Sequence, residues 1–150
     1  MKTTNIALSL AVGCLIAASA AAAPVENVKI IANDQMKFSV TRIEAEPGQT
    51  VHVELKNSGS MPLAVMGHNW ILLKAGKDPV AYANLAMVDA ADHYMPKNLN
   101  GEVIAYIGLQ GPGQTGEVTF TAPEKPGDYA FLCSFPGHCQ SGMRGVLSVK

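Results

Sequence analysis

The residues best suited to chemistry lie close together near the end of the chain. Within residues 133–143 the sequence places Cys133, His138 and Met143 on one short segment. Together they offer a thiolate, an imidazole and a thioether. Soft sulfur ligands favour Cu(I) and imidazole also binds copper, so this set points to a type 1 copper site with two histidines, one cysteine and a weak axial methionine. Such a site needs a second histidine from elsewhere in the chain.

Three other histidines are candidates for that position. His52 lies on the polar side of an alternating segment, which predicts exposure to solvent. His93 lies near the end of an expected helix, where the helix dipole favours a cation. His68 interrupts an apolar segment, and a buried polar group is costly unless it is paired or coordinated. His68 is therefore the predicted second histidine ligand.

Short strands must position these ligands. Residues 50–56 alternate apolar and polar side chains with a period of two, which indicates a half-buried strand. Turn signals such as Pro47-Gly48 and Pro126-Gly127 separate similar segments. Many short strands at this spacing predict an antiparallel sandwich or barrel. The expected strands are residues 28–32, 36–40, 50–56, 64–73, 103–108, 117–120, 129–133 and 146–149.

One long segment breaks this pattern. Asp78 is a typical N-cap and Pro79 suits the first position of a helix. We expect a helix from there to His93, closed before Pro96. This helix would form a crossover outside the sandwich.

The first residues have the composition of a secretory signal. Lys2 is the only charge, an apolar run follows at residues 6–12, and alanines precede a cleavage position after Ala22. We therefore assign residues 1–22 to a signal peptide and residues 23–150 to a single domain exported to the periplasm. The apolar run is too short to span a membrane.

The exported chain is weakly acidic. Without Lys2, Lys+Arg falls from 11 to 10 while Asp+Glu stays at 12, so the net charge is −2. The sequence contains no run of basic residues, and nucleic-acid binding is not expected. A lipid anchor at Cys14 is the alternative to plain secretion.

Two other interpretations remain open. Cys133 and Cys139 are the two cysteines of the exported chain, and in an oxidising compartment they could form a disulfide in a non-redox protein. A copper-delivery protein would use similar ligands, but it needs exposed ones. Cys133 shares a strand face with Tyr129 and Phe131, so its sulfur should point inward. Cys139 is then a spare thiol, because one copper needs one thiolate.

Three separated stretches carry a further signal. They are Asn33-Asp34-Gln35-Met36, Met66-Gly67-His68-Asn69-Trp70 and Cys133-Ser134-Phe135-Pro136-Gly137-His138. In these stretches the chain resembles the azurin-like blue copper proteins of the cupredoxin family. The resemblance implies an all-β, eight-stranded Greek-key sandwich or barrel with one short helical crossover. It also implies copper bound by His68, Cys133, His138, the axial Met143 and the weak axial carbonyl of Gly67.

The resemblance extends to the surroundings of the site. It implies that the backbone N–H of Asn69 faces the cysteine sulfur and that Phe135 packs beside the metal. It further implies an apolar rim around an exposed edge of His138. The rim residues would be Met36, Met61, Met66, Pro136 and Gly137.

The function implied by the resemblance is that of an electron carrier and not of an enzyme. Single electrons would pass between periplasmic redox partners as copper alternates between Cu(II) and Cu(I). The partners would be a c-type cytochrome or a copper or haem oxidoreductase, docking transiently on a monomer. Four residues separate His138 from Met143, a spacing more similar to plastocyanin or auracyanin than to azurin.

Overall fold

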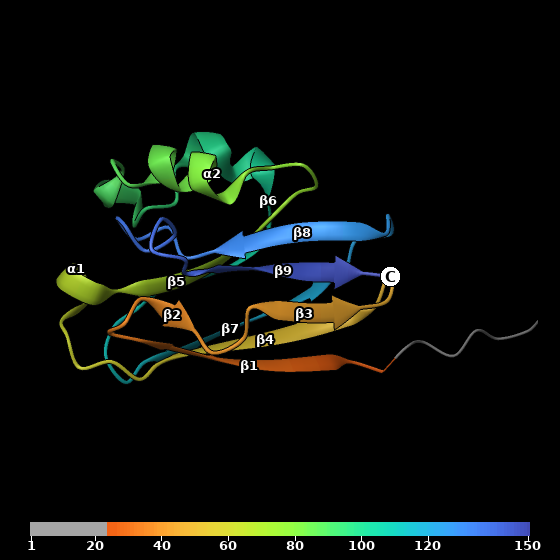
Figure 1. Cartoon of the computed structure of the whole chain (residues 1–150), viewed down its shortest axis with the longest axis horizontal. Coiled ribbons are helices and arrows are strands. Elements are labelled where there is room, and N and C mark those ends of the chain that lie inside the picture. Colours follow the sequence, from red (N-terminus) through yellow and green to blue (C-terminus); the bar gives the residue numbers. More distant parts are fainter. Residues whose placement is uncertain (1–23) are drawn as a thin grey trace, which may run out of the picture.

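Alternating burial along the strands produces two packed sheets. The computed structural model describes residues 24–150. In strand β4 (Thr50–Asn57), Val51, Val53 and Leu55 are fully buried while the residues between them face outward. Because successive side chains of a strand point to opposite faces, each sheet acquires one apolar face. The two sheets lie face to face (Figure 1), and their apolar faces share one core.

The strands are divided between a four-stranded and a five-stranded sheet. The first has the order β2-β1-β4-β7, with bounds Lys37–Phe38, Glu26–Asn33, Thr50–Asn57 and Thr115–Thr121. The second has the order β3-β9-β8-β5-β6, with bounds Arg42–Ala45, Arg144–Val149, Gly127–Leu132, His68–Leu73 and Val103–Gln110. The pairs β1–β4 and β3–β9 are parallel, and the other pairs are antiparallel.

The predicted all-β sandwich is confirmed, with differences in its strands. Within residues 24–150 there are nine strands, not eight, in two separate sheets that do not close into a barrel. The strand expected at residues 36–40 is only the two-residue β2, and β3 follows it in the other sheet. The chain therefore changes sheets between Phe38 and Arg42.

Strand β5 is buried along its whole length. Trp70 and Leu72 point into the core between the sheets, whereas Ile71 and Leu73 belong to a second apolar cluster on the outer face. The strand expected at residues 64–73 was predicted to begin too early, because Leu63–Met66 forms the short helix α1. His68 is thus the first residue of β5.

The second cluster exists because the crossover covers the outer face of the five-stranded sheet. Helix α2 (Pro79–Ala86) lies over β8 (Figure 1). As predicted, Asp78 caps α2 by accepting a hydrogen bond from the Ala81 N–H at 2.7 Å. The helix ends at Ala86 and not at His93.

The rest of the crossover consists of two 3-10 helices, η1 (Ala90–Asp92) and η2 (Lys97–Glu102). Asp89 begins η1 by accepting a hydrogen bond from the Asp92 N–H. His93 then closes η1 in the left-handed conformation, which excludes one continuous helix over this segment.

The predicted signal peptide, residues 1–22, and the alternative lipid anchor at Cys14 lie outside the described residues. Among residues 24–150, no helix has the length and apolar character needed to cross a lipid bilayer.

Close packing at Gly145 gives a test of the sandwich. A Cβ at this position would collide with the ring of Phe131 and the backbone carbonyl of Thr41. Gly145→Ala should therefore lower the free energy of unfolding by about 1–3 kcal/mol, the usual cost of overpacking. Gly108 is the matched control, because it is also a half-buried strand residue and its added Cβ would meet nothing within 4 Å. Equal loss in both variants on urea denaturation would contradict this packing.

Candidate metal centre

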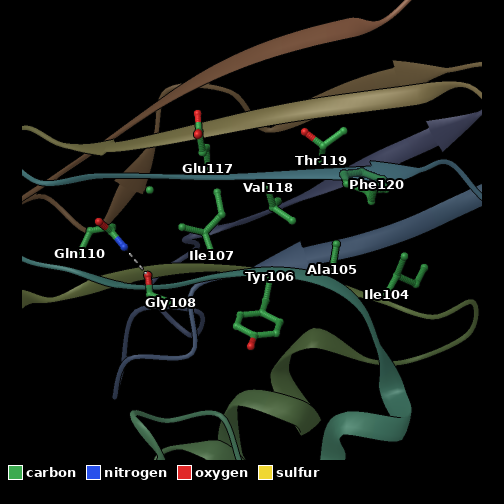
Figure 2. Close-up of a pocket in the computed structure, with 11 residues that line it drawn as sticks. Ile104, Ala105, Tyr106, Ile107, Gly108, Gln110, Glu117, Val118, Thr119 and Phe120 are labelled. Carbon is green, nitrogen blue, oxygen red and sulfur yellow. Dashed lines mark hydrogen bonds between the residues drawn. The ribbon is translucent and has the colours of Figure 1, made fainter.

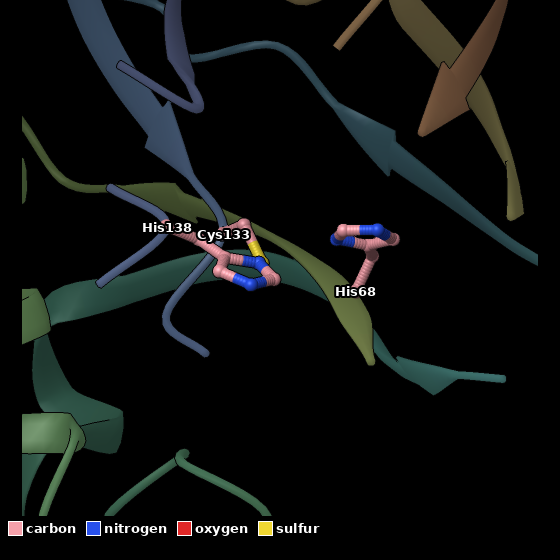
Figure 3. Close-up of side chains that lie close together, drawn as sticks. All are labelled: His68, Cys133 and His138. Carbon is pink, nitrogen blue, oxygen red and sulfur yellow. The ribbon is translucent and has the colours of Figure 1, made fainter. Parts of the chain in front are cut away.

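Three side chains from separate segments converge at one end of the sandwich. His68 begins β5, Cys133 follows β8, and His138 lies on the loop between β8 and β9 (Figure 3). Their potential ligand atoms all lie within 4.8 Å of one another. Within the described part of the chain, no other three His, Cys, Asp or Glu side chains form such a group. All three residues are buried.

The loop that carries two of these residues is closed by its own backbone. The Cys133 N–H donates to the Met143 carbonyl, and the Met143 N–H donates to the His138 carbonyl, both at 3.0 Å. Gly142 adopts a φ of 97°, which glycine reaches without steric cost. These features accommodate the four residues between His138 and Met143 and return the chain to β9.

His68 has the environment of a ligand. It is fully buried, and neither ring nitrogen has a hydrogen-bond partner among the described residues. Burial lowers the pKa of His68. The Asn33 backbone and the Asp34 carboxylate oppose this shift, although neither is in hydrogen-bonding geometry with the ring. An unpaired buried imidazole is costly, and a coordinated metal ion would remove that cost.

His138 is more deeply buried than the sequence predicted. Only 2% of its surface is exposed, which corrects the expectation of an exposed edge. The ring packs against Phe135 and His68, with centroid distances of 4.7 Å and 4.9 Å. Burial, followed by the charge of His68, lowers the pKa of His138 to about 4. Both histidines are therefore neutral at neutral pH, which is the form that binds metals.

Cys133 completes the group. Its sulfur lies 3.5 Å from Nδ1 of His138. Burial raises the pKa of the Cys133 thiol to about 12, while the backbone N–H groups of Asn69 and Phe135 oppose this shift. The Asn69 contact was predicted, whereas the Phe135 contact was not. A metal ion that replaces the thiol proton would relieve the burial cost, so the donor set fits copper.

The two expected axial groups lie on the segments that carry the three converging side chains. Met143 is fully buried in the same core cluster as Cys133. Gly67 directly precedes His68, and a Cβ there would lie 2.8 Å from the Leu63 carbonyl. The close approach of α1 to this position explains why glycine is needed. Coordination by Met143 and Gly67 remains a prediction.

A buried hydrogen-bond network connects the loop with β5 and the crossover. Asn69 donates to the Ser134 hydroxyl and accepts from the Ser134 N–H, both at 2.8 Å. The Ser134 hydroxyl in turn donates to the Tyr94 carbonyl at 2.5 Å. The sequence did not identify Ser134 or Tyr94. The polar pair Asn69 and Ser134, both next to expected ligands, was the available signal.

The structure contradicts the alternative of a Cys133–Cys139 disulfide. Both cysteines are free thiols, and they belong to different apolar clusters. Cys139 faces α2, where its sulfur donates to the Pro79 carbonyl at 3.5 Å. Cys139 thus packs the loop of residues 133–143, which we call the ligand loop, against the crossover.

The other two histidines considered as ligands, His52 and His93, lie outside the metal centre. His52 is on the outer face of the first sheet, with Nδ1 2.9 Å from the Thr119 hydroxyl. His93 is exposed on the crossover.

A groove of about 560 Å³ runs between β6 and β7, where Ile107 and Val118 point into it (Figure 2). None of the residues that line this groove belongs to the metal centre.

Comparisons with known proteins agree with this donor set. Residues 25–150 match the family described as copper binding proteins, plastocyanin/azurin family. An azurin from Pseudomonas fluorescens biotype A is 40% identical over 126 residues, covering 82% of this chain and 97% of its own.

Solved structures of auracyanins are also similar. Auracyanin A, a "blue" copper protein from Chloroflexus aurantiacus, superposes with a TM-score of 0.73 at 33% identity, covering 85% of this chain and all of its own. Dithionite-reduced auracyanin from Roseiflexus castenholzii gives a TM-score of 0.72 at 30% identity, covering 87% of this chain and 99% of its own.

The buried histidines predict how pH affects the stability of the copper-free protein. The pKa of His138 is about 4 when folded and near 6.5 when unfolded, so between these values the unfolded chain binds the extra proton. The contribution of His138 to the free energy of unfolding should be fully present above pH 6.5. As the pH falls toward 4, the free energy of unfolding should decrease by roughly 3 kcal/mol because of His138 alone. Urea denaturation across this range measures the loss. His138→Gln should flatten the slope, and an unchanged slope would show that His138 does not cause it.

Proposed function

The chain belongs to the plastocyanin/azurin family of copper-binding proteins, and from that premise we propose that it is a type 1 copper electron carrier. The observation that carries the proposal is the buried group of two neutral histidines and one cysteine, in which neither nitrogen of His68 has a hydrogen-bond partner within residues 24–150. When bound, copper would supply the Cu(II)/Cu(I) couple. The proposed ligands are His68, Cys133, His138, Met143 and the Gly67 carbonyl.

The chain itself would keep the ligands in place in both oxidation states. His68 is held by a strand that is buried on both faces, and Cys133 by the backbone closure of its loop. The Asn69–Ser134 bonds tie these two segments together. A pre-formed site of this kind needs little rearrangement when it gains or loses one electron. Its complete burial also argues against a copper-delivery protein, which would need accessible ligands.

Partner proteins would approach the loop near His138. Pro136 and Gly137 are exposed beside this buried histidine, and Met61 is 38% exposed. Met36 and Met66 are half-buried. An apolar surface of this kind suits the small, short-lived contacts of redox partners, which bury less than ~1,200 Å² in total. We propose a c-type cytochrome or a copper or haem oxidoreductase as the partner.

The remaining parts of the proposal concern the setting of the protein. Residues 1–22 would direct export and be removed, leaving a domain of residues 23–150 that works as a monomer in the periplasm. The proposed transient contacts require no second copy of the chain.

Reconstitution with Cu(II) tests the copper site. Purified protein should develop an intense blue thiolate-to-copper absorption band, and Cys133→Ser should lack it because the thiolate is gone. Cys139→Ser is the matched control and should retain the band, since Cys139 faces the other cluster. A green colour would indicate a stronger axial Met143 bond within the same site. Colourless wild-type protein would overturn the proposal.

A charge on the docking surface tests the proposed contact. Pro136→Glu should slow electron exchange with a cytochrome c partner while leaving the blue band nearly unchanged, because Pro136 is exposed and is not a proposed ligand. Stopped-flow spectroscopy at moderate ionic strength measures the exchange rate. Loss of the band would show that this position supports the copper site, and an unchanged rate would place docking elsewhere.

A further inference from the structure

Three aromatic rings in contact connect the metal centre with the crossover. The His138 ring packs on Phe135 with a centroid distance of 4.7 Å and an interplanar angle of 39°. Phe135 in turn makes an edge contact with Tyr94 at 5.0 Å and 69°. Both distances lie in the range of direct aromatic contact. The rings therefore form an unbroken series from a proposed copper ligand to a residue between η1 and η2.

Both backbone polar groups of Tyr94 form hydrogen bonds that fix its position. Its N–H donates to the Asp89 carbonyl at 2.9 Å, and its carbonyl accepts from the Ser134 hydroxyl. His93 and Tyr94 have φ values of 53° and 61°, a left-handed conformation that is strained for residues other than glycine. Such strain persists only where the surroundings determine the conformation. The contacts with Asp89 and Ser134 thus direct the Tyr94 ring onto Phe135.

Burial decreases stepwise along this series. His138 is 2% exposed and Phe135 is 7% exposed, whereas Tyr94 is half-buried and its neighbour His93 is exposed. His93 also lines a surface hollow of about 410 Å³. The series consequently leads from the interior to the partly exposed Tyr94, which is next to the exposed His93 in the chain.

We propose that Phe135 and Tyr94 form a second route for electrons, from the metal centre to the surface of the crossover. The inference rests on the proposed copper electron carrier. One electron passes between the centre and an external one-electron donor or acceptor, and no bond forms or breaks. The rings shorten the through-space gap and are not themselves oxidised. His138 thus has two connections to the surface, one beside Pro136 and one through Tyr94.

A photosensitiser on His93 tests the route. A ruthenium–bipyridine label is coordinated to His93 in a His52→Gln background, and the protein is loaded with copper and reduced. A flash with an electron-accepting quencher gives Ru(III), which then takes one electron from Cu(I) to yield Ru(II) and Cu(II). Tyr94→Leu should slow this step several-fold, while Tyr94→Phe keeps the ring and should retain the rate.

Two controls separate the route from general effects. With the label on His52 in a His93→Gln background, Tyr94→Leu should leave the rate unchanged, because His52 lies on the other sheet. Tyr106→Leu should leave the His93-label rate unchanged, since Tyr106 borders the same hollow without packing on Phe135. Equal slowing from both label sites would overturn the route, as would an unchanged rate in Tyr94→Leu. If Tyr94→Leu does not fold, Tyr94→Met provides the same comparison.

Further readouts distinguish this route from the copper site itself. In copper-free protein, NMR should show close contacts between ring protons of Tyr94 and Phe135, and their absence would refute the route without any metal. In Tyr94→Leu the blue band and the reduction potential should match the wild type, so slower transfer then supports the route. If wild-type protein forms no blue band, the electron-carrier proposal fails and the route fails with it. A normal blue band with unchanged transfer rates overturns the route alone.

Discussion

Burial of two imidazoles and a thiol in one apolar core is the constraint on which the centre depends. In water these groups would exchange protons and hydrogen bonds freely. In the core, the pKa values of His68 and His138 are lowered and that of Cys133 is raised, so the three groups are neutral. Among the described residues, the His68 ring has no hydrogen-bond partner, which is costly in such a place. A soft cation that replaces the thiol proton would satisfy all three groups together. The burial that makes these neutral groups costly is therefore also what favours copper.

The sandwich alone does not hold the ligand loop. One side of the loop is tied to β5 and the crossover by Asn69, Ser134 and Tyr94. On another side, Cys139 packs the loop under α2. The crossover thus supports the metal centre as well as covering the sheet. This explains why the crossover carries two strained residues, His93 and Tyr94.

Local patterns were reliable where one physical preference governed the result. The N-cap at Asp78 and the alternation in β4 followed from hydrogen bonding and strand geometry within a few residues. The same local reasoning failed at the end of α2 and at α1. The alanine-rich segment has good helix propensity, but Asp89 caps a separate 3-10 helix soon after α2 ends. The bond from Ser134 then holds the Tyr94 carbonyl beyond that helix. Likewise, the burial of His138 depends on the ring of Phe135 packing over it.

By itself, the sequence determined the donor types, the strand faces and the copper chemistry they suit, because side-chain identity and period-two alternation are local properties. It singled out His68 because a polar residue in an apolar segment is costly unless it is coordinated. Only the tertiary structure brought His68, Cys133 and His138 within 4.8 Å and sealed them from solvent. It also decided the separation of Cys133 from Cys139 and the ring series to Tyr94. These distances join residues far apart in the chain, and they are set by how two sheets and a crossover pack together.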